Sequence, residues 1–309
     1  MMTKSSRRSF VKSALAAGAA AFSAVPSRLL ANPSAAEQDK GSSVKFVAEV
    51  GNIGDCTVEE TIQYAKDLKM EGISVPWVRV PGFQQNGFIE AGPLTAIRAK
   101  IEDAGLVFHS MMASLPRTLA GTGPDAEKDF GNLRKSLQAM NAVRADLLSA
   151  FVPVPRTGPW EDVVSLYSKL MKEFEPAGVR MASHSGGRLN TWAALIQLMK
   201  DVPSRCNGIC YCTGNVWHGE HEKIYDIPAP VAEKIYYIHI RNVKTGEGEK
   251  EYWFHEGDID FRKLVASIRK IGYTGYLRSE HLPTDHYNLP VRQSDVGTAW
   301  AQGYMRAIL

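Results

Sequence analysis

Short apolar runs that recur along the chain restrict its fold more than any other sequence feature. Three of them cover residues 179–184, 208–212 and 236–240, and roughly 20 residues separate each from the next. Turn-forming or polar residues bound each run, which is typical of short buried strands. The spacing leaves room for one helix between two parallel strands, as in a βαβ unit.

The same pattern extends over the whole chain after residue 43. We predict eight strands, each followed by a helical segment, and this repeat indicates an α/β protein with a (β/α)8 TIM barrel in a single domain. A doubly wound sheet would need a glycine-rich G-x-G-x-x-G turn after the first strand, and residues 51–54 (GNIG) do not supply it. The predicted strands cover residues 44–50, 72–77, 106–112, 146–152, 179–184, 208–212, 236–240 and 273–279.

The N-terminal residues read as a targeting segment rather than as part of the fold. Residues 6–12 (SRRSFVK) match the twin-arginine export pattern, and an alanine-rich apolar stretch follows at 14–25. We therefore predict a signal peptide over residues 1–31, a polar linker over 32–43 and the barrel over 44–309. The expected location is the periplasm or another exported compartment.

The net charge argues against nucleic acid or a membrane as a partner. The chain has a formal charge of +3, but its first 31 residues hold five Lys or Arg and no acid. Without them, 31 basic residues face 33 acidic ones, so no basic stripe is expected. After signal cleavage we expect no membrane contact. A small-molecule carbohydrate or sugar acid is the expected partner, and a homo-oligomer is compatible with the sequence.

Four residues suited to binding a metal lie at or near the ends of successive predicted strands. They are His184, Cys212, His239 and Glu280. Because parallel strands of a barrel end at the same face, these side chains should converge. Imidazole, thiolate and carboxylate can share one divalent cation. Glu280 is preferred over His281 as the fourth ligand, since alternation along a strand lets only one of the two face the cavity.

The cysteines allow two other interpretations. Exported proteins form disulfides, and a bridge between Cys206 and Cys210 is compatible with their spacing. A closed zinc site made by Cys206, Cys210 and Cys212 with His218 and His221 is the second interpretation. It would leave His184 and His239 without a role.

Further polar residues surround the expected metal site. Arg241 and Asn242 follow His239, and Arg278 precedes Glu280, so these three are candidates for binding a substrate carboxylate. His255 lies on the loop after the seventh strand and is our candidate acid or base. Arg241 is included with it as a catalytic candidate. Weaker candidates are Glu49 and His109, and Tyr211 is expected in the core.

Three motifs resemble those of mannonate dehydratases, a branch of the xylose isomerase-like TIM barrels. They are residues 207–216 (NGICYCTGNV), 238–243 (IHIRNV) and 254–257 (FHEG). The resemblance implies Mn²⁺ held by His184, Cys212, His239 and, by position, Glu280. It is good over residues 145–309 and thin before them. The chain departs from the family after the first ligand (HSGG at 184–187) and at its last motif (RSEHLP at 278–283).

The resemblance makes a metal-dependent lyase, a dehydratase acting on a sugar acid, the expected function. A sugar isomerase or epimerase of the same superfamily is the first alternative, and it would require Glu49 to help supply a pair of carboxylate bases. A non-catalytic exported carbohydrate-binding barrel is the second. The ligand types alone favour Zn²⁺, whereas the resemblance favours Mn²⁺.

Overall fold

The strands form one closed barrel, as predicted. The computed structural model describes residues 44–51, 56–248, 250–282 and 295–309. The predicted signal peptide and linker lie outside them. All eight strands pair in parallel, in the order β1-β10-β7-β6-β5-β4-β3-β2. Their bounds are β1 Lys45–Glu49, β2 Gly72–Pro76, β3 Val107–Ser114, β4 Leu147–Phe151, β5 Arg180–His184, β6 Asn207–Cys212, β7 Ile235–Ile240 and β10 Tyr276–Ser279.

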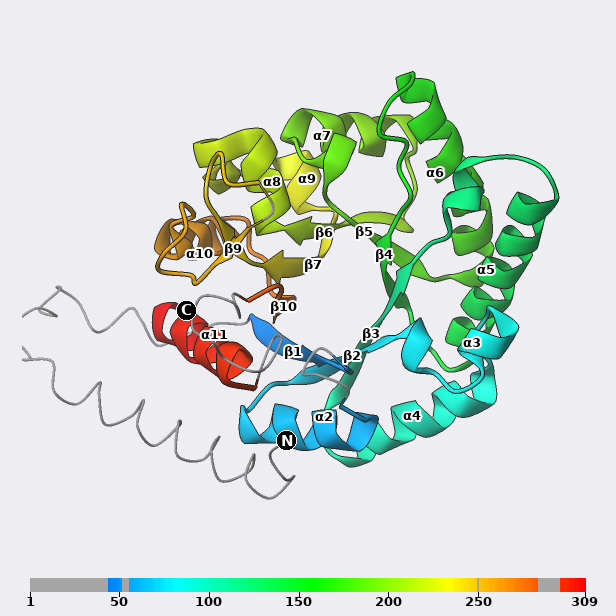
Figure 1. Ribbon diagram of the computed structural model, residues 1–309, viewed down its shortest axis with the longest axis horizontal. Helices are drawn as coiled ribbons and strands as arrows, with labels where there is room; N and C mark the ends of the chain where they lie inside the picture. Colours follow the sequence, from blue (N-terminus) through cyan, green and yellow to red (C-terminus); the bar gives the residue numbers. More distant parts are fainter. Residues whose placement is uncertain (1–43, 52–55, 249, 283–294) are drawn as a thin grey trace, which may run out of the picture.

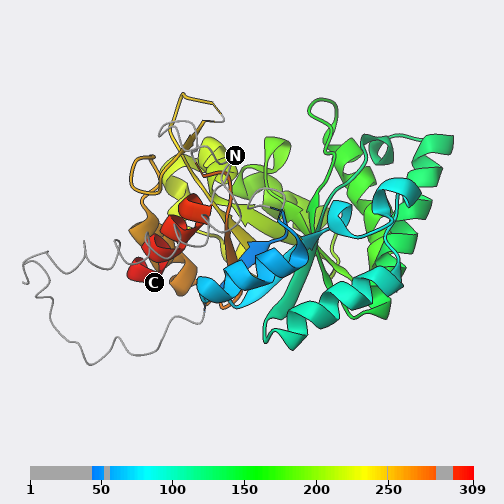
Figure 2. The same ribbon diagram turned by 60° about the horizontal axis from the view of Figure 1, so that its bottom comes forward.

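Helices surround this barrel, and α11 lies beside β1 and α2 in Figures 1 and 2. The longer helices are α2 Val58–Asp67, α4 Ala91–Asp103, α5 Pro124–Ala142, α6 Trp160–Ala177, α7 Trp192–Asp201, α10 Phe261–Lys270 and α11 Asp295–Ile308. The shorter ones are α3 Phe83–Asn86, α8 Thr213–Glu220 and α9 Ala229–Ala232. No helix in the described ranges is long and apolar enough to cross a membrane.

Local sequence signals explain where several helices begin and end. Thr57 accepts from the backbone N–H of Glu60 while the Glu60 side chain accepts from that of Thr57, which makes a capping box at the start of α2. Helix α6 includes Pro176 in its last turn. It ends where Gly178 adopts φ +66°, a left-handed conformation that glycine adopts at little cost.

Two elements near the C-terminal mouth of the barrel were not predicted. Helix α8 follows β6 without a loop, and two glycines in its eight residues weaken its helical signal. Strands β8 Asn242–Val243 and β9 Glu251–Tyr252 form an antiparallel hairpin after β7. Residues 244–248 lie between the two strands, toward the tip of this hairpin. Both elements contribute residues to the site described below.

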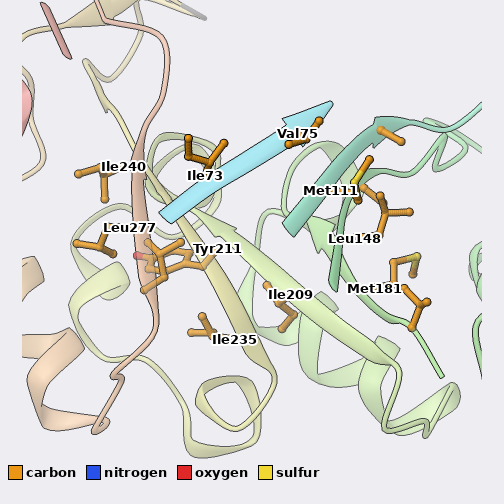
Figure 3. Packing of buried hydrophobic residues seen from close by; sticks show 14 of the residues in the cluster. Ile73, Val75, Met111, Leu148, Met181, Ile209, Tyr211, Ile235, Ile240 and Leu277 are labelled. Carbon is orange, nitrogen blue, oxygen red and sulfur yellow. The ribbon is translucent and has the colours of Figure 1, made fainter. Parts of the chain in front are cut away.

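Side-chain alternation divides the buried residues between two regions. Outward-facing residues of the strands, such as Ile209 and Tyr211 of β6, pack in the large core under the helices (Figure 3). The residue between them, Cys210, packs inside the barrel with Val47, Leu147, Ala182 and Tyr237. Alternate residues of a strand therefore face the interior, as its pleat requires. The predicted core position of Tyr211 is confirmed.

His109 lies in the barrel interior, below the mouth. Its ring stacks on Tyr276, with 4.1 Å between centroids, and meets Tyr237 edge to face at 4.8 Å. Its Nε2 atom has no hydrogen-bond partner among the described residues. Burial lowers the pKa of His109 to about 3, with Arg180 and His239 adding to the effect. His109 therefore packs in the interior as a neutral ring, and the structure does not give it the catalytic role for which it was a candidate.

This half-buried imidazole should make folding sensitive to acid. Because the folded-state pKa lies below the usual histidine value of 6.5, the unfolded chain binds a proton that the folded one excludes. Stability is fully present above pH 6.5 and falls as the pH drops toward 3, by a few kcal/mol. We expect His109→Gln to flatten that part of the pH profile of chemical unfolding. The exposed His255→Gln is the control, and an unchanged slope in His109→Gln would contradict this account.

Candidate active site and metal centre

The carboxylate of Glu280 is the meeting point of the predicted metal ligands. His184 Nε2 lies 3.3 Å and Cys212 Sγ 3.4 Å from Glu280 Oε2, and His239 Nδ1 lies 3.2 Å from Glu280 Oε1. The four residues end or follow β5, β6, β7 and β10, which are consecutive in the barrel. Side chains distant along the chain therefore converge as the fold predicted. Glu280 and His239 are 2% and 0% exposed.

Mutual electrostatics govern this cluster. Burial would raise the pKa of Glu280, but His184 and His239 hold it well below its usual range. Burial would lower the pKa of His184, yet Glu280 and Cys212 outweigh burial and raise it to about 10. His239 behaves in the opposite way, because burial outweighs Glu280 and lowers its pKa to about 4. The Glu280 carboxylate thus lies between one cationic and one neutral imidazole.

The donor set fits a divalent cation. His184, Cys212 and Glu280 each offer an atom within 4.8 Å of the others, and His184, Cys210 and His239 form a second such group. These separations suit ligands that share one ion at bond lengths of about 2.0–2.3 Å. His239 Nε2 is buried and has no hydrogen-bond partner among the described residues. A buried lone pair without a partner is costly unless a ligand binds it.

Neither alternative interpretation of the cysteines agrees with the structure. Cys206, Cys210 and Cys212 are all free thiols, so the Cys206–Cys210 disulfide is absent. The closed zinc site was also wrong for the described residues, because the groups able to hold a metal include neither His218 nor His221. Strand alternation is the reason, since Cys210 and Cys212 face the barrel interior.

Arg278 was expected to bind substrate, but the structure places it under the cluster. Its guanidinium lies 3.1 Å from Glu49 Oε1 and 3.9 Å from Glu280 Oε1, and it does not line the pocket. Glu49 is buried as well, and burial outweighs Arg278 and raises its pKa. Arg278 therefore compensates two buried carboxylates. Removing one partner of such a group leaves an uncompensated charge.

Arg241 is fixed beside the cluster by two elements that were not predicted. Its guanidinium donates to Glu251 of β9 and to Asn215 Oδ1 of α8. Asn215 in turn donates to Ser185 O at 2.7 Å and lies 3.4 Å from His184 Nδ1. Cys212 and Glu251 raise the pKa of Arg241 against the effect of burial. Asn215 belongs to the motif at residues 207–216, three residues after Cys212. Its contact with Arg241 could not be predicted from that motif, because it depends on how the chain folds.

Two other predicted site residues lie elsewhere. The Asn242 amide donates to the carbonyls of Phe254 and Ile259 and accepts from the N–H of Ile259, so it pins the hairpin and does not face the pocket. His255 packs against Trp300, with 5.3 Å between ring centroids, and its side chain is 55% exposed. It is absent from the pocket lining. The structure therefore gives neither residue the expected place beside the substrate.

His281 shares the pocket with Glu280, contrary to the expectation that only one of them faces it. The strand ends at Ser279, and His281 adopts φ +46°, so the alternation of a strand no longer applies. Its Nε2 lies 3.6 Å from Glu280 Oε1, and its side chain is 51% exposed. Burial lowers its pKa, which leaves a neutral imidazole at the pocket.

A pocket of about 760 Å³ opens above the cluster. His184, Glu280 and His281 line it beside four arginines, and Glu280 is the single acid of its lining in the described part of the chain. Apart from Arg241, the arginines come from loops after β3, β4 and β5, where no strand periodicity marks them. The arginines are Arg117, Arg156, Arg188 and Arg241.

The fold is that of a known enzyme family. The family model of the xylose isomerase-like TIM barrel matches residues 62–306, so the chain belongs to that family. A mannonate dehydratase of Streptococcus agalactiae serotype Ia is 24% identical over 151 residues, 44% of this chain and 43% of that protein. A mannonate dehydratase of Shouchella clausii is 23% identical over 220 residues, 66% of this chain and 58% of its own length. The chain thus spans about half the length of these relatives.

Solved structures agree on the fold. A mannonate dehydratase from Streptococcus suis serotype 2 has a TM-score of 0.67 at 18% identity, covering 87% of this chain and 94% of that one. A D-psicose 3-epimerase from Clostridium cellulolyticum H10, solved with D-tagatose, has a TM-score of 0.66 at 15% identity, covering 86% and 99%. Both neighbours are enzymes that share the barrel but carry different names, so the fold alone leaves the reaction open.

Proposed function

We propose that this protein is a metal-dependent lyase that removes water from a sugar acid. The observation that supports this most strongly is a His, Cys, His and Glu cluster under an arginine-lined pocket. A neutral sugar would gain little from four arginines, whereas a carboxylate matches the guanidinium group in shape and charge. The relatives named mannonate dehydratase favour the same substrate class.

In this proposal, His184, Cys212, His239 and Glu280 hold one divalent ion, either Mn²⁺ or Zn²⁺. When bound, the ion supplies a Lewis acid that stabilises negative charge next to the substrate carboxylate. Arg241 contributes positive charge beside the ion, and its hydrogen bonds to Glu251 and Asn215 hold the guanidinium group in place. A charged group that is already held in position stabilises the negative charge that develops on the substrate without having to rearrange.

His281 replaces His255 as the candidate base, because it is neutral and lines the pocket. It takes the proton from C2 of the acid. The electron pair left on C2 forms the C2–C3 double bond as the C3 hydroxyl leaves as water, with the proton that His281 took from C2. The resulting enol loses its hydroxyl proton and gains a proton at C3, which gives a 2-keto-3-deoxy acid. A base within reach of the substrate carbon is the geometric requirement for this step.

An epimerase is the alternative, and the structural similarity to D-psicose 3-epimerase favours it. That reaction needs a base on each side of one carbon. Glu49, the second carboxylate in the interior, is bound to Arg278 and does not line the pocket. The arrangement of the carboxylates therefore supports the lyase over the epimerase. A carbohydrate-binding barrel without chemistry would bind sugars and turn over none of them.

Export through the twin-arginine route stays a prediction, since residues 1–31 lie outside the described part of the chain. That route carries folded proteins, so the metal would be loaded before export. Replacing Arg7 and Arg8 by Lys should retain the full-length protein in the cytoplasm, which cell fractionation checks. Equal export of this variant and the wild type would rule the route out.

Removal of the cluster's thiol should abolish metal retention and turnover together. Cys212→Ser removes a ligand that is 0% exposed, and losing the ion should lower turnover at least 100-fold. Metal content and a screen of aldonates and aldoses provide the measurement. Cys206→Ser is the matched control, because Cys206 is also buried and packs outside the cluster. Full activity in Cys212→Ser would refute the assignment.

The four arginines that line the pocket should favour a negatively charged substrate over a neutral one. Replacing both Arg156 and Arg188 by Ala should raise KM for the acid about tenfold, a loss of about 1.4 kcal/mol, with kcat nearly unchanged. The corresponding neutral sugar should be affected little. Arg180→Ala, which breaks an exposed ion pair with Asp146 away from the pocket, is the control. An equal effect on acid and neutral sugar would contradict an acidic substrate.

A further inference from the structure

We propose that Cys210 is a second thiolate ligand of the metal centre, which makes the site selective for a thiophilic cation such as Zn²⁺ over Mn²⁺. This inference rests on the proposed metal centre, but it concerns a residue to which neither the motifs nor the proposed lyase gives a role. The resemblance implies one sulfur ligand, Cys212. The structure brings a second sulfur to the same place.

Strand geometry places both sulfurs on one side of β6. Cys210 and Cys212 are two residues apart, so both project into the barrel, while Tyr211 between them packs under the helices. Both cysteines are 0% exposed and free. Cys210 pairs with Tyr237 and Cys212 with His239 of β7. The two thiols therefore lie at successive levels of the interior, next to the strand that carries His239.

The donor atoms form two triangles that share His184. One joins His184, Cys212 and Glu280, and the other joins His184, Cys210 and His239, with all separations in each within 4.8 Å. His239 Nε2 is fully buried and has no hydrogen-bond partner among the described residues. Cys210 is thus the sulfur that completes a triangle with this imidazole. An ion held by this second triangle would take Cys210 as its sulfur donor.

Two buried guanidinium groups lie near the sulfurs, but burial, Glu280 and Cys212 outweigh Arg278 and raise the pKa of Cys210 well above its usual range, so a bound cation is needed to hold its thiolate. Two thiolates and a carboxylate exceed the charge of a divalent ion by one. Arg278 interacts electrostatically with Cys210, and Arg241 with Cys212, and both guanidinium groups are nearly inaccessible to solvent. Buried anions persist only where such partners exist. Softer sulfur ligands favour Zn²⁺ over Mn²⁺, which prefers oxygen.

Titration of the metal-free protein with Co²⁺ tests the number of thiolates without measuring turnover. Each cobalt–thiolate bond absorbs in the near ultraviolet. We expect Cys210→Ser to lose about half of the wild-type absorbance, Cys212→Ser to lose all of it because that variant does not retain the ion, and Cys206→Ser to lose none. Competition between Zn²⁺ and Mn²⁺ should show a preference for Zn²⁺ that falls at least tenfold in Cys210→Ser.

A measurement on the wild type alone guards against a variant that does not fold. X-ray absorption at the zinc edge of the Zn²⁺-loaded protein counts its sulfur neighbours, and two support the proposal. One sulfur neighbour, or full cobalt absorbance in a folded Cys210→Ser variant, overturns it and leaves the lyase proposal standing. Absence of any cobalt–thiolate band in the wild type overturns both. Two sulfurs without turnover of any sugar acid support Cys210 and refute the lyase.

Discussion

Burial of the Glu280 carboxylate is the interaction on which the rest of the site depends. A carboxylate that is 2% exposed would be expensive in the barrel interior unless cations or hydrogen-bond donors surround it. His184, His239 and Cys212 surround it from three strands, and Arg278 lies beneath it. Each of these groups is costly to bury alone, and together they satisfy one another. The same geometry makes them a set of ligands for a cation.

The fold positions this set with little help from loops. Consecutive parallel strands end at one face, so the side chains converge because the barrel closes. The residues that shape the pocket come instead from elements added after the strands. Helix α8 carries Asn215, and the hairpin carries Glu251, which together fix Arg241. A common barrel thus provides the cluster, and the additions decide what binds above it.

Sequence patterns predicted the barrel and the convergence of His184, Cys212, His239 and Glu280, because strand periodicity and strand order determine both. They did not predict which way polar side chains face once a strand has ended. His281 faces the pocket because its backbone turns to positive φ, and Asn242 faces the hairpin because β8 begins there. Arg117, Arg156 and Arg188 lie in the connections that follow β3, β4 and β5, two of them in short 3-10 helices, where tertiary packing sets the direction of a side chain. The periodicity of a strand contains no information about side-chain direction after the strand has ended or in the connections that follow it.

Anomalous diffraction from crystals of the metal-loaded protein, recorded at the absorption edge of the ion, tests the central claim most directly. The account predicts one strong peak per chain at the mouth of the barrel, bonded to His184, Cys212, His239 and Glu280. A peak elsewhere, or no peak with Glu280 still bound to both imidazoles, would contradict it.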